Sequence, residues 1–286
     1  MPDPPPGEPR VLTIDGLRLQ VLDHGSGNDA APPLLLLHGG MAHARWWDLV
    51  APALADLAQP FALDRRGHGD SEWTTVERYG WERDLLDIEE VMRTLSPRPW
   101  SVAGHSQGAL LAVYLATRGN VSIDRLVLLD VPLEPASPRL TRAGRAFNRV
   151  PQLRYPTLTH ATDRFQPFPT PHRIDAPVLD YLARHSFKAL PDGGFTSKFH
   201  WKSYQCDRSR EGTPLADYGE RLRRIAIPVL SLRGAESTIL GAAEQTELLR
   251  RLPDGRGIEI AAATHSLHAE QPGAVAHAMR DFLARV

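Results

Sequence analysis

The clearest chemical signal in the sequence is a serine inside the pentapeptide 104–108, which reads GHSQG. A serine hydroxyl is a weak nucleophile at neutral pH unless a base takes its proton during attack. Glycines at both ends permit a tight turn, and the apolar run at 109–115 predicts a helix whose N-terminus points at Ser106. The backbone N–H of Gln107 would then face the oxyanion formed when Ser106 attacks a carbonyl. The pattern predicts a nucleophilic serine.

A second glycine loop follows the short aliphatic run at 34–37. Residues 38–41 read HGGM, and the small side chains let the backbone approach a ligand closely. The N–H of Gly40 or of Met41 would supply a second hydrogen bond to the oxyanion. Both remain candidates on the sequence alone.

Four motifs in this order make the chain resemble the α/β-hydrolase superfamily from residue 11 to the end. They are HGG at 38–40, DRRGHGDS at 64–71, the pentapeptide around Ser106, and THSLHAEQP at 264–272. The resemblance implies an α/β fold with a mostly parallel eight-stranded sheet, helices on both faces, and a helical cap inserted after the sixth strand. It also implies a catalytic triad in the order serine, acid, histidine.

The same resemblance assigns roles to three further side chains. It identifies His265 as the base, with His268 as a structural neighbour. A zinc site at these two histidines is not supported, because no third or fourth ligand stands at suitable spacing. Asp64 matches a carboxylate that ties down its own loop, outside the triad.

The acid of the triad departs from the family pattern. Relatives usually carry Asp about four residues after the glycine that ends the seventh strand, and here Thr238 takes that place. A hydroxyl cannot carry the negative charge that stabilises an imidazolium. Asp130, at the end of the sixth strand, is our first candidate, and Glu236, two residues before Thr238, is the alternative. The absence of any acid, or another residue such as Glu134, also stays open.

Regular elements must bring these residues together. Residues 11–23 predict a β-hairpin around the turn pair Asp15-Gly16. Apolar runs predict further strands, and apolar spacing predicts helices. The strands are expected at 34–37, 61–63, 101–103, 126–129, 229–232 and 257–261. The helices are expected at 81–95, after the Ser106 loop through Arg118, and from Pro272 onward. This alternation is typical of a parallel sheet covered on both faces.

The chain divides into three parts. Residues 1–10 are rich in proline and predict a disordered tail. Residues 11–131 and 221–286 form the expected α/β-hydrolase core domain. Residues 132–220 show no regular βαβ pattern and predict a mostly helical cap over the strand ends, where open α/β sheets place their sites.

Composition excludes several classes of partner. The net charge of −1 gives no attraction to nucleic acid or to an anionic membrane. The longest aliphatic run is too short to span a bilayer, and the N-terminus does not resemble a secretory signal. The single cysteine, Cys206, cannot form an intramolecular disulfide. We therefore expect a cytoplasmic monomer or homodimer that acts on a small molecule without a cofactor or metal.

These observations predict a serine hydrolase that cleaves a carboxylic ester, lactone or thioester of a small to medium apolar substrate. Epoxide hydrolysis and dehalogenation are disfavoured, because relatives with those activities carry Asp where Ser106 stands. Two alternatives stay open. Thr238 leaves room for a non-hydrolytic role, such as binding, cyclisation or cofactor-free oxygenation. Carbon–carbon bond hydrolysis would use the same triad.

Overall fold

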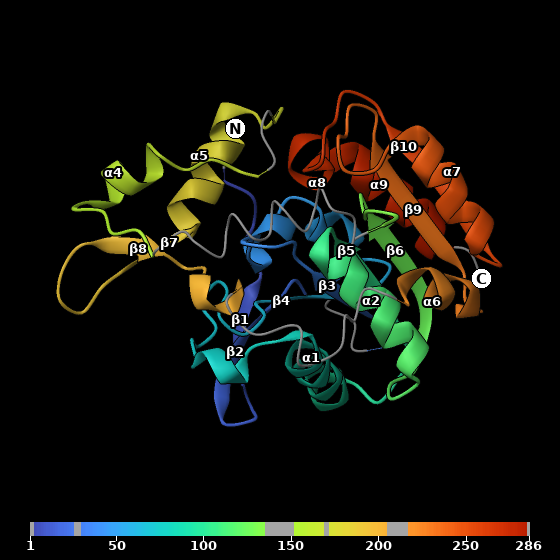
Figure 1. The fold of residues 1–286 in the computed structure, drawn as a ribbon, viewed down its shortest axis with the longest axis horizontal. Helices are drawn as coiled ribbons and strands as arrows, with labels where there is room; N and C mark the ends of the chain where they lie inside the picture. Colours follow the sequence, from blue (N-terminus) through green and yellow to red (C-terminus); the bar gives the residue numbers. More distant parts are fainter. Residues whose placement is uncertain (1–2, 26–29, 135–151, 169–171, 205–216, 285–286) are drawn as a thin grey trace.

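The structure is a computed structural model that describes residues 3–25, 30–134, 152–168, 172–204 and 217–284. Its centre is an eight-stranded sheet in the order β1-β2-β4-β3-β5-β6-β9-β10 (Figure 1). β1 and β2 pair antiparallel with their neighbours, and every other pair is parallel. The strands are β1 (Glu8–Ile14), β2 (Leu17–Asp23), β3 (Pro33–Leu37), β4 (Gln59–Leu63), β5 (Trp100–His105), β6 (Ile123–Leu129), β9 (Val229–Gly234) and β10 (Gly255–Ile260).

Both faces of the sheet are buried, which explains why the central strand β3 is apolar throughout. In β3, Leu35 and Leu37 join one hydrophobic core, whereas Leu34 and Leu36 join a second core on the opposite face. The first core is closed by α1 (Trp81–Leu95), α2 (Gln107–Arg118), α6 (Tyr218–Arg224) and α7 (Ala242–Arg251). The second is closed by η1 (Ala44–Trp47), η2 (Ala51–Leu54), α8 (Leu267–Glu270) and α9 (Pro272–Leu283). This arrangement confirms the predicted α/β-hydrolase fold.

The segment after β6 forms a lobe beside the sheet, coloured yellow to orange in Figure 1. Its described elements are α4 (Leu158–Thr162), α5 (Ala176–His185), β7 (Phe187–Ala189), β8 (Phe195–Ser197) and η4 (Trp201–Tyr204). A small apolar cluster joins α5 to the loop after β3 through Val178, Leu182, Ala42 and Trp46. The cap therefore sits next to the HGGM loop. The β7–β8 hairpin was not anticipated in a cap expected to be mostly helical.

Two predicted boundaries were wrong. β1 begins at Glu8, so residues 8–10 belong to the sheet, because the Asp15-Gly16 turn sets a register that pairs Glu8 with Asp23. Pro9 is tolerated there because β1 is an edge strand. The core also resumes before residue 221, since the buried residues Tyr218 and Leu222 of α6 belong to the core beside α2 and α7.

Some predictions concern residues that the structure does not describe. Cys206 and residues 135–151 lie outside the described residues. Among the helices in the described ranges, none combines the length and apolar character needed to cross a membrane.

Candidate active site

Ser106 stands alone between β5, which ends at His105, and α2, which begins at Gln107. Its φ of 51° and ψ of −114° lie in a region that L-residues rarely occupy. Its N–H donates to the carbonyl oxygen of Leu129 at 2.9 Å, which ties the turn to the end of β6. Such strain persists only where surrounding contacts impose it, and it is common at functional sites. The strand–turn–helix expected around Ser106 is present.

The two glycines of the pentapeptide allow this turn to close. A Cβ added to Gly104 would lie 2.5 Å from the backbone nitrogen of Ala109. A Cβ on Gly108 would lie 2.7 Å from the carbonyl oxygen of His38 and closer still to that of Leu37. Both distances are shorter than real Cβ contacts. The glycines are therefore required by close backbone packing.

His265 and Asp130 meet across the sheet although 135 positions separate them in sequence. His265 Nδ1 lies 2.7 Å from Asp130 Oδ2, and both side chains are buried. Asp130 directly follows β6 and has a φ of 47°, which turns its carboxylate toward the loop after β10. Because the carboxylate accepts the Nδ1 proton, the neutral ring keeps Nε2 free to take a proton. This contact favours Asp130 over the other candidates for the acid.

Two further donors hold the Asp130 carboxylate. Ser237 Oγ donates to Oδ2 at 2.6 Å, and the N–H of Gly234 donates to Oδ1 at 3.3 Å. Hydrogen bonds to the charged form of a carboxylate stabilise that form. Ser237 immediately precedes Thr238, so the loop that carries the acid in relatives here supplies a hydroxyl to the acid. Ser237 could not be identified from the sequence, because its partner is known only once Asp130 is placed.

The alternative acids lie elsewhere. Glu236 binds the guanidinium of Arg173 in the cap, at 2.5 Å and 2.8 Å, and its side chain is 45% exposed. Glu134 is exposed. Neither carboxylate is hydrogen-bonded to His265 within the described part of the chain. Glu236 links the cap to the core.

His105 connects the Ser106 turn to the His265 loop. Its Nε2 lies 2.9 Å from the carbonyl oxygen of His265, and the two ring centroids are 4.6 Å apart. A carbonyl only accepts, so Nε2 of His105 carries a proton. Burial lowers the pKa of His105 well below its ordinary value, so the ring is neutral. His105 therefore connects the turn that carries Ser106 to the loop that carries His265.

His268 is fully buried, as expected for a structural neighbour of His265. Its ring centroid lies 5.0 Å from that of Trp47 and 4.4 Å from that of His105. Neither ring nitrogen has a hydrogen-bond partner among the described residues. Burial lowers the pKa of His268 from 6.5 to about 3. No group of three or more His, Cys, Asp or Glu side chains in the described ranges is placed to hold a metal ion.

The buried His268 predicts acid sensitivity of folding. Its pKa is lower in the folded chain, so only the unfolded chain takes up this proton as pH falls from about 6.5 toward 3. Stability is therefore lost in that window, by about 2 kcal/mol between about pH 7.5 and pH 5. We expect His268→Phe to remove this part of the pH dependence of stability and to leave kcat within about two-fold of the wild type. Urea unfolding at both pH values checks it, and an unchanged pH dependence would contradict it.

Three backbone amides in the HGGM loop and at the start of α2 lack a hydrogen-bond acceptor among the described residues. They are the N–H groups of Gly40, Met41 and Gln107. Met41 has a φ of 60°, and a Cβ on Gly40 would collide with the Tyr204 hydroxyl and approach Gln107 Oε1 to 3.3 Å. These amides are available to an incoming oxyanion.

A cavity of about 270 Å³ opens between the cap and these loops. Gly40 and Met41 line it from the core, together with His105 and Ser266, which are the chain neighbours of Ser106 and His265. The cap contributes mainly aromatic and apolar side chains, namely Leu153, Tyr155, Phe165, Pro167, Phe168, Phe187 and Phe199. These are the cap aromatics that the sequence could not single out. Trp46 also lines the cavity, whereas Trp47 is fully buried.

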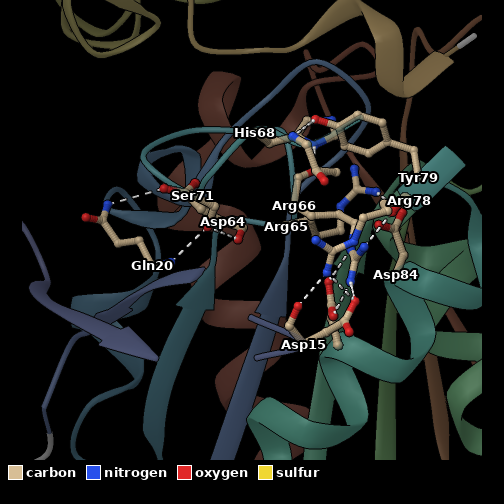
Figure 2. A network of polar contacts seen from close by, with 12 residues as sticks. Asp15, Gln20, Asp64, Arg65, Arg66, His68, Ser71, Arg78, Tyr79 and Asp84 are labelled. Carbon is tan, nitrogen blue, oxygen red and sulfur yellow. Dashed lines mark hydrogen bonds and ion pairs between the residues drawn. The ribbon is translucent and has the colours of Figure 1, made fainter. Parts of the chain in front are cut away.

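Asp64 of the loop after β4, labelled in Figure 2, is hydrogen-bonded to the segment that follows the HGGM loop. Asp64 accepts hydrogen bonds from the N–H groups of Ala44 at 2.6 Å and of Asp70 at 2.9 Å. Burial raises the pKa of Asp64 to about 6. The carboxylate ties two loops together and lies outside the triad, as the sequence indicated.

Comparisons with known proteins agree with this fold. The model of the alpha/beta hydrolase family matches residues 34–278. Esterase Rv0045c of Mycobacterium tuberculosis is 27% identical over 285 residues, covering 96% of this chain and 89% of the relative. Esterase YbfF of Escherichia coli is 26% identical, covering 88% and 92%. The crystal structure of E-2-(acetamidomethylene)succinate hydrolase has a TM-score of 0.80 at 22% identity, covering 98% and 100%.

The family match covers most of the chain, and full-length relatives of this family carry the names of hydrolases. The strained turn at Ser106 lies between a strand and a helix, as the GHSQG motif predicts. The chain therefore belongs to the alpha/beta hydrolase family and is an enzyme of the hydrolase class.

Proposed function

We propose that this hydrolase cleaves a carboxylic ester, lactone or thioester through an acyl-enzyme on Ser106, without a cofactor. The observation that carries the proposal is the 2.7 Å contact between His265 Nδ1 and Asp130 Oδ2, beside the strained Ser106 turn. It supplies the acid that Thr238 cannot provide. The non-hydrolytic alternative depended on that missing acid and loses its main support.

In the acylation step, Ser106 Oγ attacks the carbonyl carbon while His265 Nε2 takes the hydroxyl proton. The N–H of Gln107 and that of Gly40 or Met41 bind the oxyanion. The carbon–oxygen or carbon–sulfur bond then breaks, and His265 returns the proton to the leaving alcohol or thiol. The Asp130 carboxylate stabilises the imidazolium between these transfers.

In the deacylation step, water takes the place of the leaving group. His265 removes one proton from the water as its oxygen attacks the acyl carbon. The tetrahedral intermediate collapses, the bond to Ser106 breaks, and the proton returns to Oγ. The products are a carboxylic acid and the free enzyme.

The cavity indicates the size and polarity of the substrate. Its volume of about 270 Å³ is near the lower end for small-molecule pockets. Most of the cap residues that line it are aromatic or apolar. An acyl or alcohol part of small to medium size and mainly apolar surface fits this space. The esterases among the relatives agree with an ester as the bond cleaved.

A fluorophosphonate probe tests the proposal, because it phosphonylates a serine activated by a base. We expect labelling of the wild type and none of Ser106→Ala. Ser266→Ala is the matched control, since Ser266 lines the same cavity and its hydroxyl has no partner among the described residues. The labelled enzyme should lose turnover of p-nitrophenyl esters, thioesters and lactones. Equal labelling of Ser106→Ala, or labelling without turnover of any substrate class, would overturn the proposal.

A further inference from the structure

One buried guanidinium touches both segments that offer oxyanion donors. Arg65 Nη2 lies 3.0 Å from Gln107 Oε1 and 3.3 Å from the carbonyl oxygen of Gly39. Arg65 Nη1 lies 3.1 Å from Asp84 Oδ2, which balances its charge, and the arginine side chain is 1% exposed. Figure 2 shows Arg65 beside Asp84, on the loop that Asp64 anchors. Neither the proposed mechanism nor the sequence motifs assign a role to this side chain.

The contact with Gly39 controls the direction of the next N–H group. In a planar trans peptide, the carbonyl of one residue and the N–H of the following residue point in opposite directions. Holding the Gly39 oxygen toward Arg65 therefore turns the Gly40 N–H away from the buried guanidinium. Gly40 lines the cavity, and a Cβ on Gly39 would stand 3.4 Å from that of Ser106. The contact thus aims the Gly40 amide toward the cavity side.

His38 strengthens the same contact. The backbone N–H of Arg65 donates to His38 Nε2 at 3.3 Å, so the proton of the neutral ring sits on Nδ1. Nδ1 lies 2.7 Å from the Gly39 oxygen and donates to it. Burial, followed by the charge of Arg65, lowers the pKa of His38 well below its ordinary value, which keeps the ring neutral. The Gly39 carbonyl therefore has two donors, and Arg65 makes or orients both.

The contact with Gln107 acts on the other half of the site. Gln107 is the first residue of α2, and its N–H is the donor that follows the nucleophile. Arg65 holds its Oε1 beside Gly40 rather than over the reacting atoms. The two loops that must stay aligned to bind one oxygen are therefore joined by one rigid, planar group.

We infer that Arg65 is a positioning residue for the oxyanion site, which rests on the proposed function. It contacts no reacting atom and acts through Gly39 and Gln107. Donors aimed at a developing charge accelerate the reaction only when they are correctly placed in advance. Losing Arg65 should therefore weaken binding of the transition state and leave ground-state binding unchanged.

The neighbouring arginine provides a matched control. Arg66 is equally buried, and its Nε and Nη2 bind Asp87 at 2.5 Å and 2.6 Å. Its other hydrogen-bond partners among the described residues are the carbonyl oxygen of Arg78 and the carboxylate of Asp15. It contacts neither Gly39 nor Gln107. A substitution there removes a buried ion pair from the same loop without touching the two donor segments.

The experiment compares Arg65→Met and Arg65→Lys with Arg66→Met, using an activated ester and its trifluoromethyl ketone analogue, which forms an oxyanion with the serine. We expect Arg65→Met to lower kcat about 10- to 100-fold, with KM within about two-fold. The inhibition constant of the ketone should rise by the same factor as kcat falls. Arg65→Lys should recover part of the loss, because one ammonium reaches one of the two acceptors. Folded Arg66→Met should keep kcat and the inhibition constant of the ketone within about three-fold of the wild type.

Gln107→Leu keeps the backbone donor and removes the side-chain oxygen that Arg65 binds. It therefore tests the contact between Arg65 and Gln107 even where Arg65→Met folds poorly. The effect of Arg65→Met should be smaller in the Gln107→Leu background than alone. An unchanged ketone inhibition constant in Arg65→Met and Arg65→Lys, a rise in KM alone, or strict additivity with Gln107→Leu would overturn the inference. Turnover that survives Ser106→Ala would instead overturn the proposed function, and the inference with it.

Discussion

Replacing Asp130 by Asn is expected to lower kcat by about 10³- to 10⁴-fold while KM stays within about three-fold. Asparagine keeps the size of the side chain, and its oxygen in the place of Oδ1 still accepts from the N–H of Gly234, but it carries no charge to stabilise the imidazolium. Its amide also donates to His265 Nδ1, which moves the ring proton to Nε2. That nitrogen can then no longer accept the proton of Ser106.

Glu236→Gln is the control for this prediction, because Glu236 is the other carboxylate near the expected acid position. Its carboxylate binds Arg173, so we expect kcat to stay within about two-fold. Steady-state kinetics on one activated ester, with urea unfolding to verify folding, compare the two variants. A large loss in Glu236→Gln together with near-normal turnover in Asp130→Asn would assign the acid to Glu236 instead.

Gly108→Ala is expected to lower the free energy of unfolding by about 3 kcal/mol or more. The new methyl group would meet the carbonyl oxygens at the end of β3, with His38 at 2.7 Å and Leu37 closer. Those atoms cannot move away easily, because β3 is hydrogen-bonded to β4 on one side and β5 on the other. The collision is with backbone, so a change of side-chain rotamer cannot relieve it.

Gly273→Ala is the matched control, because Gly273 is also the second residue of a helix. It lies in α9, is exposed, and a Cβ there would have no neighbour within 4 Å. We expect this change to stabilise the protein by about 0.5–1 kcal/mol through better helix propensity. Urea unfolding followed by circular dichroism measures both variants. Equal stabilities of the two alanine variants would show that the turn around Ser106 has more room than the structure gives it.

The sequence was sufficient to predict those elements whose conformation depends on residues close to them in the chain. The helix at 81–95 has the predicted bounds and the helix after Ser106 ends at Arg118 as predicted, because apolar spacing and nearby prolines or glycines act within a few residues. The run Leu34 to Leu37 indicated a strand buried on both faces, and its side chains enter both cores. The turn around Ser106 was likewise predicted from its flanking strand and helix.

Elements that depend on distant partners were harder to predict. α7 has only two buried residues, Gln245 and Leu248, so its sequence shows little apolar spacing. β1 extends to Glu8 because β2 offers a partner there, not because residues 8–10 favour a strand. The same reason explains α6, whose first residues become core only by packing near α2.

For the site, the sequence by itself predicted a nucleophile, a base, two candidate oxyanion loops and a short set of carboxylates. Only the tertiary structure placed one of these carboxylates, Asp130, against His265. β6 and β9 lie side by side, so Asp130, His265 and the Ser237 loop meet, while Glu236 turns to the cap. It likewise placed Arg65 against Gly39 and Gln107. A hydrogen bond needs about 3 Å between atoms, and residues more than a hundred positions apart reach that distance only when the whole sheet has formed.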